Sequence, residues 1–594
     1  MPTLPIVFTT QEDPGFIQDL ENRIKANPNC SFLLHYPIVY IHYWVSGNVS
    51  YTDRHGNTHS YNKYGVYVGE SNDVISRTKQ HYDEALDPNQ WQNQLYLAQN
   101  HAHVLPEFIV IGHEHFNKSL TLDIENRLIE YIMSVKGLSK IHNARGNPQN
   151  QYYPQKEFKP IFKQVWNKLH QKQKDLFPAE SVIFDSAIFK ASPLKKLTDE
   201  QREAKEQIIK KVIAAINNHL DGQLIFIQGE AGTGKTVLTT STFYELIKQS
   251  SEISQSIKCH LIVNHDQQLT VYQQMAERLD LGEGIVNKPT SFINAHSPSN
   301  KVDVCFIDEG HLLLTQGKMS YQGKNQLQDV IDCSRVTVVM FDEYQVLTTE
   351  EYWEDSVLQG FKSMAKQQDN YITLDHQLRM NCAESTSEWI RRLVFDHAID
   401  EFSPDSEGYE VKAFDTPNEL YKAIEKKTKE KDCELSRVVA SYDWDYSKTK
   451  RPAGGGLWNV CIDNWSKPWN YELSHGLSRN EKIQLKKLAW AEQPHTINEI
   501  GSTFSIQGFD LSYVGVIIGP SVKFVNGQVE FFPSESKNAK ATRNRTLSDG
   551  TIDSFGKLFI RNELKVLLTR GVKGLYIYAC DPALRKALKE IAQI

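Results

Sequence analysis

The stretch from Gly229 to Thr236, Gly-Glu-Ala-Gly-Thr-Gly-Lys-Thr, constrains this chain more than any other. It fits the pattern of two glycines that flank four residues and are followed by lysine and threonine. The apolar run 224–227 precedes it, and the stretch 237–247, which is typical of a helix, follows it. Backbone N–H groups of such a loop can approach a polyphosphate closely, and the helix N-terminus adds partial positive charge. The loop therefore predicts nucleotide binding; an ordinary glycine-rich turn is the alternative.

The composition is that of a globular chain with several domains. The 594 residues, 40% hydrophobic and 23% charged, are enough for roughly three to four domains. No apolar run is long enough to cross a membrane, and the N-terminus lacks the pattern of an export signal. The eight cysteines form no C-x-x-C pair, so we expect a cytoplasmic protein without disulfides or zinc. The net charge of −7 means that any nucleic-acid contact needs local basic grooves.

Polar residues at the ends of apolar runs complete a site for a nucleoside triphosphate. Lys235 is expected to reach the terminal phosphates, and the Thr236 hydroxyl to bind Mg²⁺. An apolar run ends in Asp308 and Glu309, which suits Asp308 for Mg²⁺ and Glu309 for activating the attacking water. A second apolar run ends shortly before Gln345, which is suited to sense the γ-phosphate.

Two arginines and one glutamine extend this site. Arg379 and Arg570 are candidates to neutralise charge on the γ-phosphate in the transition state, and surface charge is the alternative for each. Gln201 lies about one helix before the loop, and its amide can pair with the adenine edge. The alternative is a helix cap shared with Thr198 and Asp199.

In this order the blocks resemble a superfamily 1 helicase motor, most nearly the Schlafen-type helicase domain. The resemblance covers 194–594 and implies two RecA-like lobes, 194–385 and 386–594, with ATP and Mg²⁺ between them. It implies that the nucleotide is bound by Gln201, Gly229, Glu230, Ala231, Gly232, Thr233, Gly234, Lys235 and Thr236. It implies catalytic roles for Glu309, Gln345, Arg379 and Arg570, and metal ligation by Thr236 and Asp308. The stretch from Thr503 to Gly508 is implied to touch the nucleic-acid backbone, a plain polar turn being the alternative.

A smaller α/β domain is expected before the motor. After a lead-in, 1–36, strands are expected at 37–45, 64–69 and 107–112, and a helix at 120–135. A polar, turn-rich excursion with its tip at 55–57 is expected between the first two strands. The polar residues that we single out here are Tyr40, Tyr67, Arg77, His81, Glu125 and Asn143.

These six residues, with Gly69, resemble the motif of the GIY-YIG endonucleases, which implies a nuclease domain over 37–150. In that family a tyrosine activates water, an arginine neutralises developing charge, and one glutamate binds a divalent cation. The resemblance therefore implies Mg²⁺ or Mn²⁺ at Glu125. Ile38 departs from the family, because it stands where the first glycine is expected. The alternatives are an α/β domain whose tyrosines only pack, and an inactive nuclease fold that binds nucleic acid.

Four other stretches have simpler interpretations. We expect a connector at 151–193, with a helix at 160–174 that begins with a proline, and a polar strand end, not a metal site, at 113–115. The aromatic stretch 441–465 is expected to pack the second lobe. The stretch 522–555 is expected to be an exposed, mobile insertion, whose basic residues either contact phosphates or are only solvated. Those residues are Lys537, Lys540, Arg543 and Arg545.

Together these patterns predict an α/β chain, with a small GIY-YIG-like nuclease domain followed by two RecA-like parallel-sheet lobes. The predicted function is an ATP-dependent nucleic-acid motor coupled to a metal-dependent endonuclease. DNA is favoured over RNA as the partner, no membrane is expected, and self-association is open. By analogy with similar fusions, a role in bacterial DNA processing or antiphage defence is suggested. The alternative is a nucleotide-gated switch or nucleic-acid-binding module that neither unwinds nor cleaves.

Overall fold

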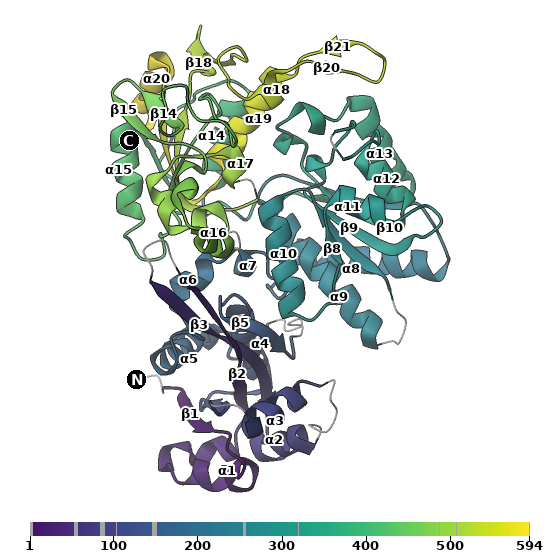
Figure 1. Cartoon of the computed structure of the whole chain (residues 1–594), viewed down its shortest axis with the longest axis vertical. Helices are drawn as coiled ribbons and strands as arrows, with labels where there is room; N and C mark the ends of the chain where they lie inside the picture. Colours follow the sequence, from purple (N-terminus) through teal and green to yellow (C-terminus); the bar gives the residue numbers. More distant parts are fainter. Residues whose placement is uncertain are drawn as a thin grey trace. The chain divides into compact units, whose positions relative to one another are not determined.

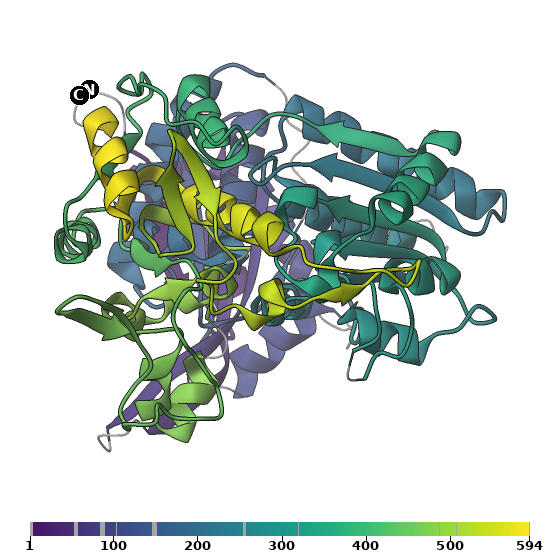
Figure 2. The same ribbon diagram turned by 90° about the horizontal axis from the view of Figure 1, so that it is seen from above.

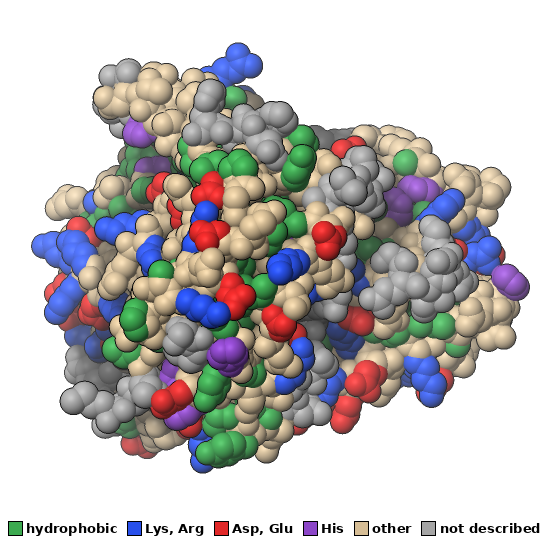
Figure 3. Space-filling model, turned by 90° about the horizontal axis from the view of Figure 1, so that it is seen from below, with side chains coloured by type: hydrophobic (Ala, Val, Ile, Leu, Met, Phe, Trp, Pro, Cys, Tyr) green, Lys and Arg blue, Asp and Glu red, His purple; other side chains and the backbone are tan. Residues whose placement is uncertain are grey.

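The computed structural model describes residues 4–52, 57–83, 90–101, 104–144, 151–252, 257–318, 320–485, 488–506 and 508–592. The chain divides into two compact units (Figure 1). The first comprises Met1–Lys196 and Val271–Glu283, and the second Leu197–Thr270 and Gly284–Ile594. No described helix combines the length and apolar character that a membrane span needs. On the face drawn in Figure 3, acidic and basic side chains are interspersed, in keeping with the modest net charge.

A five-stranded mixed sheet organises the first unit. The strand order is β1 (Ile6–Gln11), β4 (Glu107–Gly112), β2 (Ile38–Thr52), β3 (Thr58–Ser71) and β5 (Leu138–His142). Only the β3–β5 pairing of this sheet is parallel. Residues 1–36, which we expect only to lead into the domain, also supply the edge strand β1 of this sheet.

The expected excursion at 46–63 is instead a long hairpin. Strands β2 and β3 stay paired from Gly47↔Lys63 to Thr52↔Thr58, after a bulge between Val45 and Gly47. Exposed and half-buried residues alternate along this part of β2, as in a strand with one covered face. The polar residues therefore line the open face of a ribbon. Within the expected tip, His55 and Gly56 lie outside the described residues.

Helices cover the first sheet and bury its aromatic core. Phe16 and Leu20 are fully buried in a core that also contains Phe108. The segment expected to be a connector belongs to this unit, and its helix begins at Phe158, so Pro160 is the third helical residue and not the first. The helices are α1 (Phe16–Lys25), α2 (Val74–Asp83), α3 (Trp91–His101), α4 (Lys118–Met133), α5 (Phe158–Lys172), α6 (Glu180–Asp185) and α7 (Ala187–Lys190).

The second unit begins with a six-stranded parallel sheet, here called the first lobe. Its strand order is β11 (Tyr371–Leu374), β6 (Gln223–Gly229), β10 (Ser334–Phe341), β9 (Val302–Asp308), β7 (Cys259–Val263) and β8 (Val286–Asn287). Because the strands are parallel, the residues that follow β6, β9 and β10 meet at one edge of the sheet. The helices of this lobe are α8 (Asp199–Asn217), α9 (Lys235–Glu252), the start of α10 (Asp266–Arg278), α11 (Pro289–Ala295), α12 (Gln326–Asp332) and α13 (Asp355–Gln367).

A five-stranded parallel sheet forms the second lobe. Its strand order is β12 (Glu410–Ala413), β22 (Gly571–Ala579), β17 (Leu511–Ile518), β13 (Arg437–Ala440) and β16 (Gly501–Ser502). The expectation that 441–465 packs this lobe is confirmed, because Trp444, Tyr446 and Trp458 join the core around the fully buried Trp469. The other elements are α14 (Glu384–Phe395), α15 (Pro417–Lys427), β14 (Asn459–Ile462), β15 (Trp465–Pro468), α16 (Arg479–Leu485), α17 (Thr503–Ile506), α19 (Gly556–Leu568) and α20 (Pro582–Ala592).

A segment of the second lobe, residues 537–555, lies along the first lobe and is here called the strap (Figure 2). Arg545 is 5% exposed, and its Nη1, which has two hydrogens to donate, lies 2.9 Å from Thr315 Oγ1, 2.7 Å from the Thr349 carbonyl and 2.8 Å from the Tyr352 carbonyl. The Phe555 ring stacks on Tyr352, with centroids 3.8 Å apart. The expectation of an exposed insertion is therefore wrong for Arg545, whose guanidinium satisfies carbonyl groups of the other lobe.

Short elements make up the strap and the hairpin before it. They are the hairpin strands β18 (Val522–Val525) and β19 (Gln528–Phe531), then α18 (Ala539–Thr542), β20 (Arg545–Thr546) and β21 (Ile552–Asp553). Thr349 Oγ1 donates to the Lys540 carbonyl (2.7 Å), Arg543 pairs with Glu350, and the Lys537 N–H donates to the Tyr442 carbonyl (2.9 Å). Arg543 thus contacts the protein through its side chain, whereas Lys537 and Lys540 do so through their backbone.

Candidate functional site

The glycine-rich loop joins β6 to α9 and holds a buried cation. Gly232 and Gly234 adopt φ values of 93° and 78°, which side chains rarely tolerate. Lys235, the first residue of α9, is 6% exposed, and its Nζ donates to the carbonyls of Gly229 and Glu230, both at 2.7 Å. This cradle is shaped for an anion, because backbone N–H groups, a helix N-terminus and an ammonium group converge on it.

Oxygen groups suited to Mg²⁺ lie beside the loop. Thr236 Oγ1 donates to Asp308 Oδ2 (3.0 Å), and Gln268 Nε2 donates to the same oxygen (2.8 Å). A hydroxyl and a carboxylate are the oxygen ligands that hard cations prefer, so these residues fit Mg²⁺. Sequence reasoning missed Gln268, because nothing near it in the chain marks it as part of a site.

Glu309 follows β9 in a left-handed conformation (φ 52°), which turns the chain sharply into the next residues. A Cβ at Gly310 would lie 2.4 Å from Val339 Cγ2, so the turn is pressed against β10. The Glu309 side chain is nearly buried, and burial raises the pKa of its carboxyl group. His311 Nε2 lies 3.4 Å from Glu309 Oε2, and burial lowers the pKa of His311 to about 4. A carboxylate with a raised pKa beside a neutral imidazole is suited to accept a proton.

A chain of polar contacts runs from the loop to the second lobe. Lys235 Nζ lies 3.7 Å from Asp342 Oδ2, which accepts a hydrogen bond from Gln345 Nε2 (2.7 Å). Gln345 Oε1 in turn accepts from Arg570 Nη2 (3.0 Å). Arg570 is fully buried, and burial, with repulsion from Arg379, lowers the pKa of its guanidinium to about 9. The structure thus joins the predicted residues Lys235, Gln345 and Arg570 through Asp342, which sequence reasoning missed.

Arg379 lies over the same loop. The N–H of Leu378 donates to the Gly232 carbonyl (2.7 Å), and a Cβ at Gly232 would lie 2.8 Å from Arg379 Cβ. Arg379 Nε lies 2.5 Å from Asp510 Oδ1 of the second lobe. Both predicted arginines are therefore near the loop, and each faces a polar group of the other lobe.

Gln201 caps a helix and also touches the loop. Its Oε1 accepts from the Thr198 N–H (3.1 Å), and its own N–H donates to Thr198 Oγ1 (3.3 Å), which completes the expected cap. Its Nε2 donates to the Thr233 carbonyl (3.1 Å). Contact with adenine stays a prediction.

The stretch expected to touch the nucleic-acid backbone is largely internal. Thr503 is fully buried, and its hydroxyl donates to Glu563 Oε1 (2.7 Å), whose pKa burial raises to about 8. The Thr503 hydroxyl therefore cannot contact a phosphate in this conformation, because it is used inside the lobe. Phe504 is half-buried and Gly508 lies near Gln268, whereas Gln507 lies outside the described residues.

In the first unit, four of the six singled-out residues meet across β2, β3 and α2. Tyr40 Oη lies 2.8 Å from His81 Nε2, and the ring centroids of Tyr40 and Tyr67 are 6.0 Å apart. Arg77, one turn before His81, interacts with both hydroxyl groups. Burial raises the pKa of both phenols and lowers that of His81 to about 3.

The remaining two residues form a pair. Asn143 Nδ2 donates to Glu125 Oε1 (2.9 Å) and to the Val68 carbonyl (2.9 Å), which ties the helix α4 to the edge of the sheet. A Cβ at Gly69 would lie 2.6 Å from Tyr40 Oη, so the approach of this tyrosine requires glycine there.

Sequence reasoning missed a cover on this cluster. The Trp91 ring of α3 stacks on Tyr67, with centroids 4.1 Å apart. Tyr40 is fully buried and Tyr67 is 5% exposed. Beyond the end of β4, His115 pairs with Glu114 (3.3 Å) and Glu157. No group of three or more His, Cys, Asp or Glu side chains that could hold a metal ion occurs among the described residues.

Comparisons with known proteins place the motor residues in a family. The model of the Schlafen group 3 DNA/RNA helicase domain matches residues 222–581. The uncharacterized protein YPL245W of Saccharomyces cerevisiae is 28% identical over 428 residues, which are 66% of this chain and 90% of that protein.

Solved structures with some similarity include two Pif1 helicase structures and one of the PRRSV helicase. One, described as the structural basis for DNA unwinding at forked dsDNA by two coordinating Pif1 helicases, is 11% identical, covers 66% of this chain and 94% of its own, and has a TM-score of 0.27. The Pif1 helicase from Candida albicans is 14% identical over 66% of this chain and 97% of its own, with a TM-score of 0.28. The PRRSV helicase is 10% identical over 63% of this chain and 56% of its own, with a TM-score of 0.26.

Residues 1–221 and 582–594 lie outside the family match. Because that match covers more than half of the chain and contains the glycine-rich loop, Asp308, Glu309, Gln345, Arg379 and Arg570, the chain belongs to the Schlafen group 3 DNA/RNA helicase domain family.

Proposed function

We propose that the second unit hydrolyses ATP and uses it to move along a nucleic acid strand, DNA in preference to RNA. The chain of contacts Lys235–Asp342–Gln345–Arg570 carries this proposal. It joins the phosphate loop of one lobe to a buried arginine of the other. A change of charge at the loop therefore alters the free energy of the contact between the lobes.

The residues have distinct roles in this proposal. The loop and Lys235 bind the phosphates, and the Gln201 amide pairs with the adenine edge. Thr236 and Asp308 would hold Mg²⁺, which when bound neutralises phosphate charge. Glu309 accepts the proton of the attacking water.

Two arginines would act on the developing charge. Arg379 and Arg570 stabilise charge on the transferred phosphoryl group, an effect that is typically about 10³–10⁵ in rate for one arginine. Both must exchange their present partners, Asp510 and Gln345, for phosphate oxygens.

A basic and aromatic surface supports nucleic acid as the track. The half-buried Phe504 ring packs edge-on against Tyr442 (centroids 5.6 Å apart), and Lys540 Nζ lies 5.6 Å from the Phe504 centroid. The pKa of Lys540 is lowered by burial and by the charges of Lys318 and Lys448. An ammonium group beside an aromatic ring, with further lysine charges acting on it, suits a phosphate backbone and a stacked base.

The test is ATPase activity measured with single-stranded and duplex DNA and RNA. Wild-type protein is expected to be stimulated most by single-stranded DNA, and Lys235→Ala to lose hydrolysis. Strand displacement is then measured on a tailed duplex. Stimulated hydrolysis without displacement would favour the alternative, a nucleotide-gated switch, and hydrolysis that no nucleic acid stimulates would overturn the motor.

We propose as a second activity that the first unit cleaves phosphodiesters in the manner of the GIY-YIG nucleases it resembles. The convergence of Tyr40, Tyr67, Arg77 and His81 supports it, with Glu125 held by Asn143 nearby. Tyr40, whose hydroxyl lies 2.8 Å from His81 Nε2, or Tyr67 would activate water, and Arg77 would neutralise the phosphoryl oxygens. Glu125 is the carboxylate that would hold Mg²⁺ or Mn²⁺.

Glu125→Gln tests this activity, with the exposed Glu114→Gln as the matched control. Cleavage of DNA or RNA in Mg²⁺ or Mn²⁺ is expected to be lost in Glu125→Gln and kept in Glu114→Gln. Equal cleavage by both variants would exclude Glu125. If the wild-type protein binds nucleic acid but does not cleave it, the unit is an inactive binding fold. Self-association is tested by light scattering; roles in DNA processing or antiphage defence stay analogies.

A further inference from the structure

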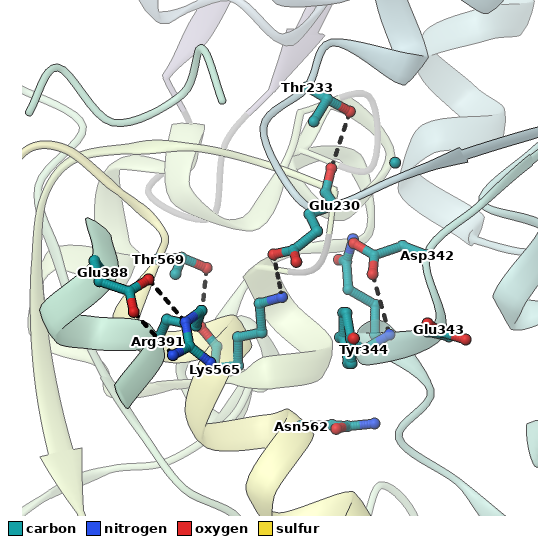
Figure 4. Close-up of polar contacts among 12 residues, drawn as sticks. Glu230, Thr233, Asp342, Glu343, Tyr344, Glu388, Arg391, Asn562, Lys565 and Thr569 are labelled. Atoms are coloured by element: carbon teal, nitrogen blue, oxygen red, sulfur yellow. Dashed lines mark hydrogen bonds and ion pairs between the residues drawn. The ribbon is translucent and has the colours of Figure 1, made fainter. Parts of the chain in front are cut away.

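A lysine that the roles above leave unused reaches from the second lobe to the phosphate loop. Lys565 lies on α19, five residues before Arg570, and its side chain is 7% exposed. Its Nζ donates to Glu230 Oε2 at 2.6 Å, and Glu230 is the second residue of the loop (Figure 4). The carbonyl of the same Glu230 accepts from Lys235 (2.7 Å). One loop residue therefore contacts both the loop lysine and the opposite lobe.

Two aromatic rings hold this lysine in place. Lys565 Nζ lies 4.2 Å from the ring centroid of Tyr344 and 5.1 Å from that of Phe395. The two rings touch each other, with centroids 4.9 Å apart at 61°. Tyr344 follows β10 of the first lobe, and Phe395 ends α14 of the second. A cation close to an aromatic ring is attracted to it, and because the two rings come from different lobes, this pocket exists only while the lobes are together.

Lys565 also acts on the chain of contacts between the lobes. Burial alone would raise the pKa of Asp342, but the charges of Lys235 and Lys565 bring it below its ordinary value. Asp342 is the carboxylate that accepts from Gln345, the partner of Arg570. Lys565 thus stabilises the ionised form of the group through which the loop and Arg570 communicate.

We infer that Lys565 is a positioning residue for ATP hydrolysis, and that its ion pair with Glu230 is a latch between α19 and the phosphate loop. The inference rests on the proposed ATPase. The latch holds α19 so that Arg570, at the end of this helix, stays at the loop. Backbone groups and Lys235 form the anion cradle without it. Loss of the latch therefore lowers kcat while nucleotide affinity remains.

The test is a double-mutant cycle with Lys565→Met and Glu230→Gln. Each single variant is expected to lower kcat for ATP about tenfold, equivalent to about 1.4 kcal/mol. Their KM and their affinity for a fluorescent ATP analogue should stay within about threefold of wild type. The double variant should be no slower than either single variant, because the two side chains act as one pair. Lys565→Arg keeps the charge and the ring contacts and should retain most of the activity.

Lys557→Met is the matched control, because Lys557 is an exposed lysine of the same helix. It should hydrolyse ATP at the wild-type rate. The latch is overturned if Lys565→Met matches the control, if the two single losses multiply in the double variant, or if Lys565→Met abolishes nucleotide binding. If the wild-type protein neither binds nor hydrolyses ATP, the proposed function fails instead. Equal melting temperatures of the variants show that the loss is not unfolding.

Discussion

Replacing Arg545 by methionine should loosen the strap from the first lobe. The substitution keeps most of the side-chain volume and removes the guanidinium. Nη1 donates its two hydrogens among Thr315 Oγ1 and the carbonyls of Thr349 and Tyr352, and Nη2 donates to the Thr315 carbonyl (3.4 Å), so about three hydrogen bonds are lost. At about 1 kcal/mol for each net hydrogen bond, the expected loss is about 3 kcal/mol.

The expected change in melting temperature follows from this loss of stability and from the unfolding entropy of the second unit. Unfolding entropy near the midpoint is about 0.8 kcal/mol per degree for a unit of this length, so the midpoint should fall by about 4 °C. Scanning calorimetry measures the shift. Limited trypsin digestion should also show faster cleavage after Lys540 and Arg543, because the strap frays.

Arg543→Met is the control, two residues away in the same strap. Arg543 pairs with Glu350, but its side chain is 47% exposed. Exposed ion pairs contribute about 0–1 kcal/mol, so its midpoint should shift by about 1 °C or less. Equal shifts for the two variants would refute the reasoning that the buried hydrogen bonds of Arg545 fasten the strap.

Three further predictions concern the sites. Gly234→Ala places a Cβ 2.1 Å from Gln201 Nε2 at a φ of 78° and should weaken binding of a fluorescent ATP analogue at least about tenfold. The control is Gly222→Ala, because Gly222 is also left-handed (φ 67°) but a Cβ there would face open space. This variant should lose about 1 kcal/mol of stability and keep nucleotide binding. Unchanged binding in Gly234→Ala, or weakened binding in Gly222→Ala, would count against the steric argument. Burial raises the carboxyl pKa of Glu563 from its ordinary value of 4.5 to about 8. Between pH 4.5 and pH 8 the folded protein therefore keeps this carboxyl protonated while the unfolded chain loses the proton, so the free energy of unfolding falls as pH rises through this range. Glu563→Gln cannot titrate, so its midpoint relative to wild type should rise between pH 5 and pH 8; a constant difference would contradict the assignment. Phe504→Ala should weaken binding of single-stranded nucleic acid about tenfold, measured by fluorescence anisotropy, and leave ATPase activity without nucleic acid unchanged.

Local patterns account for what could be predicted. The loop motif has a fixed length and context, so the strand before Gly229 and the helix from Lys235 follow from it. The acidic pair after β9 is likewise contiguous with its strand. The partners Gln268 and Lys565 could not be predicted, because each joins the site from a helix far away in sequence. The sequence next to Gln268 and next to Lys565 contains nothing that distinguishes either residue from one with a solvated side chain.

Longer-range packing explains the wrong expectations. The polar residues after Val45 belong to a two-stranded ribbon with one solvent-exposed face, because β2 and β3 continue to pair beyond the core. Residue type alone does not show where the pairing of these two strands ends. Arg545 was expected at the surface on the basis of charge, but a neighbouring lobe offers it carbonyl groups. Burial of Thr503 likewise depends on Glu563, sixty residues later in the chain.

The strap also determines how the two lobes can move. The chain passes from one lobe to the other between Leu374 and Glu384, where the Asn381 N–H donates to the Val572 carbonyl (2.9 Å). Besides the contacts of Arg379, Arg570 and Lys565 between the lobes, which must break before the lobes can move, the strap is a second attachment, made by Arg545 on the opposite lobe. A rigid body fixed to another at two points keeps one degree of freedom, rotation about the line through those points. Movement of Arg570 away from the phosphate loop is therefore a swing about that axis for as long as Arg545 stays buried, and a straight separation of the lobes first requires its release.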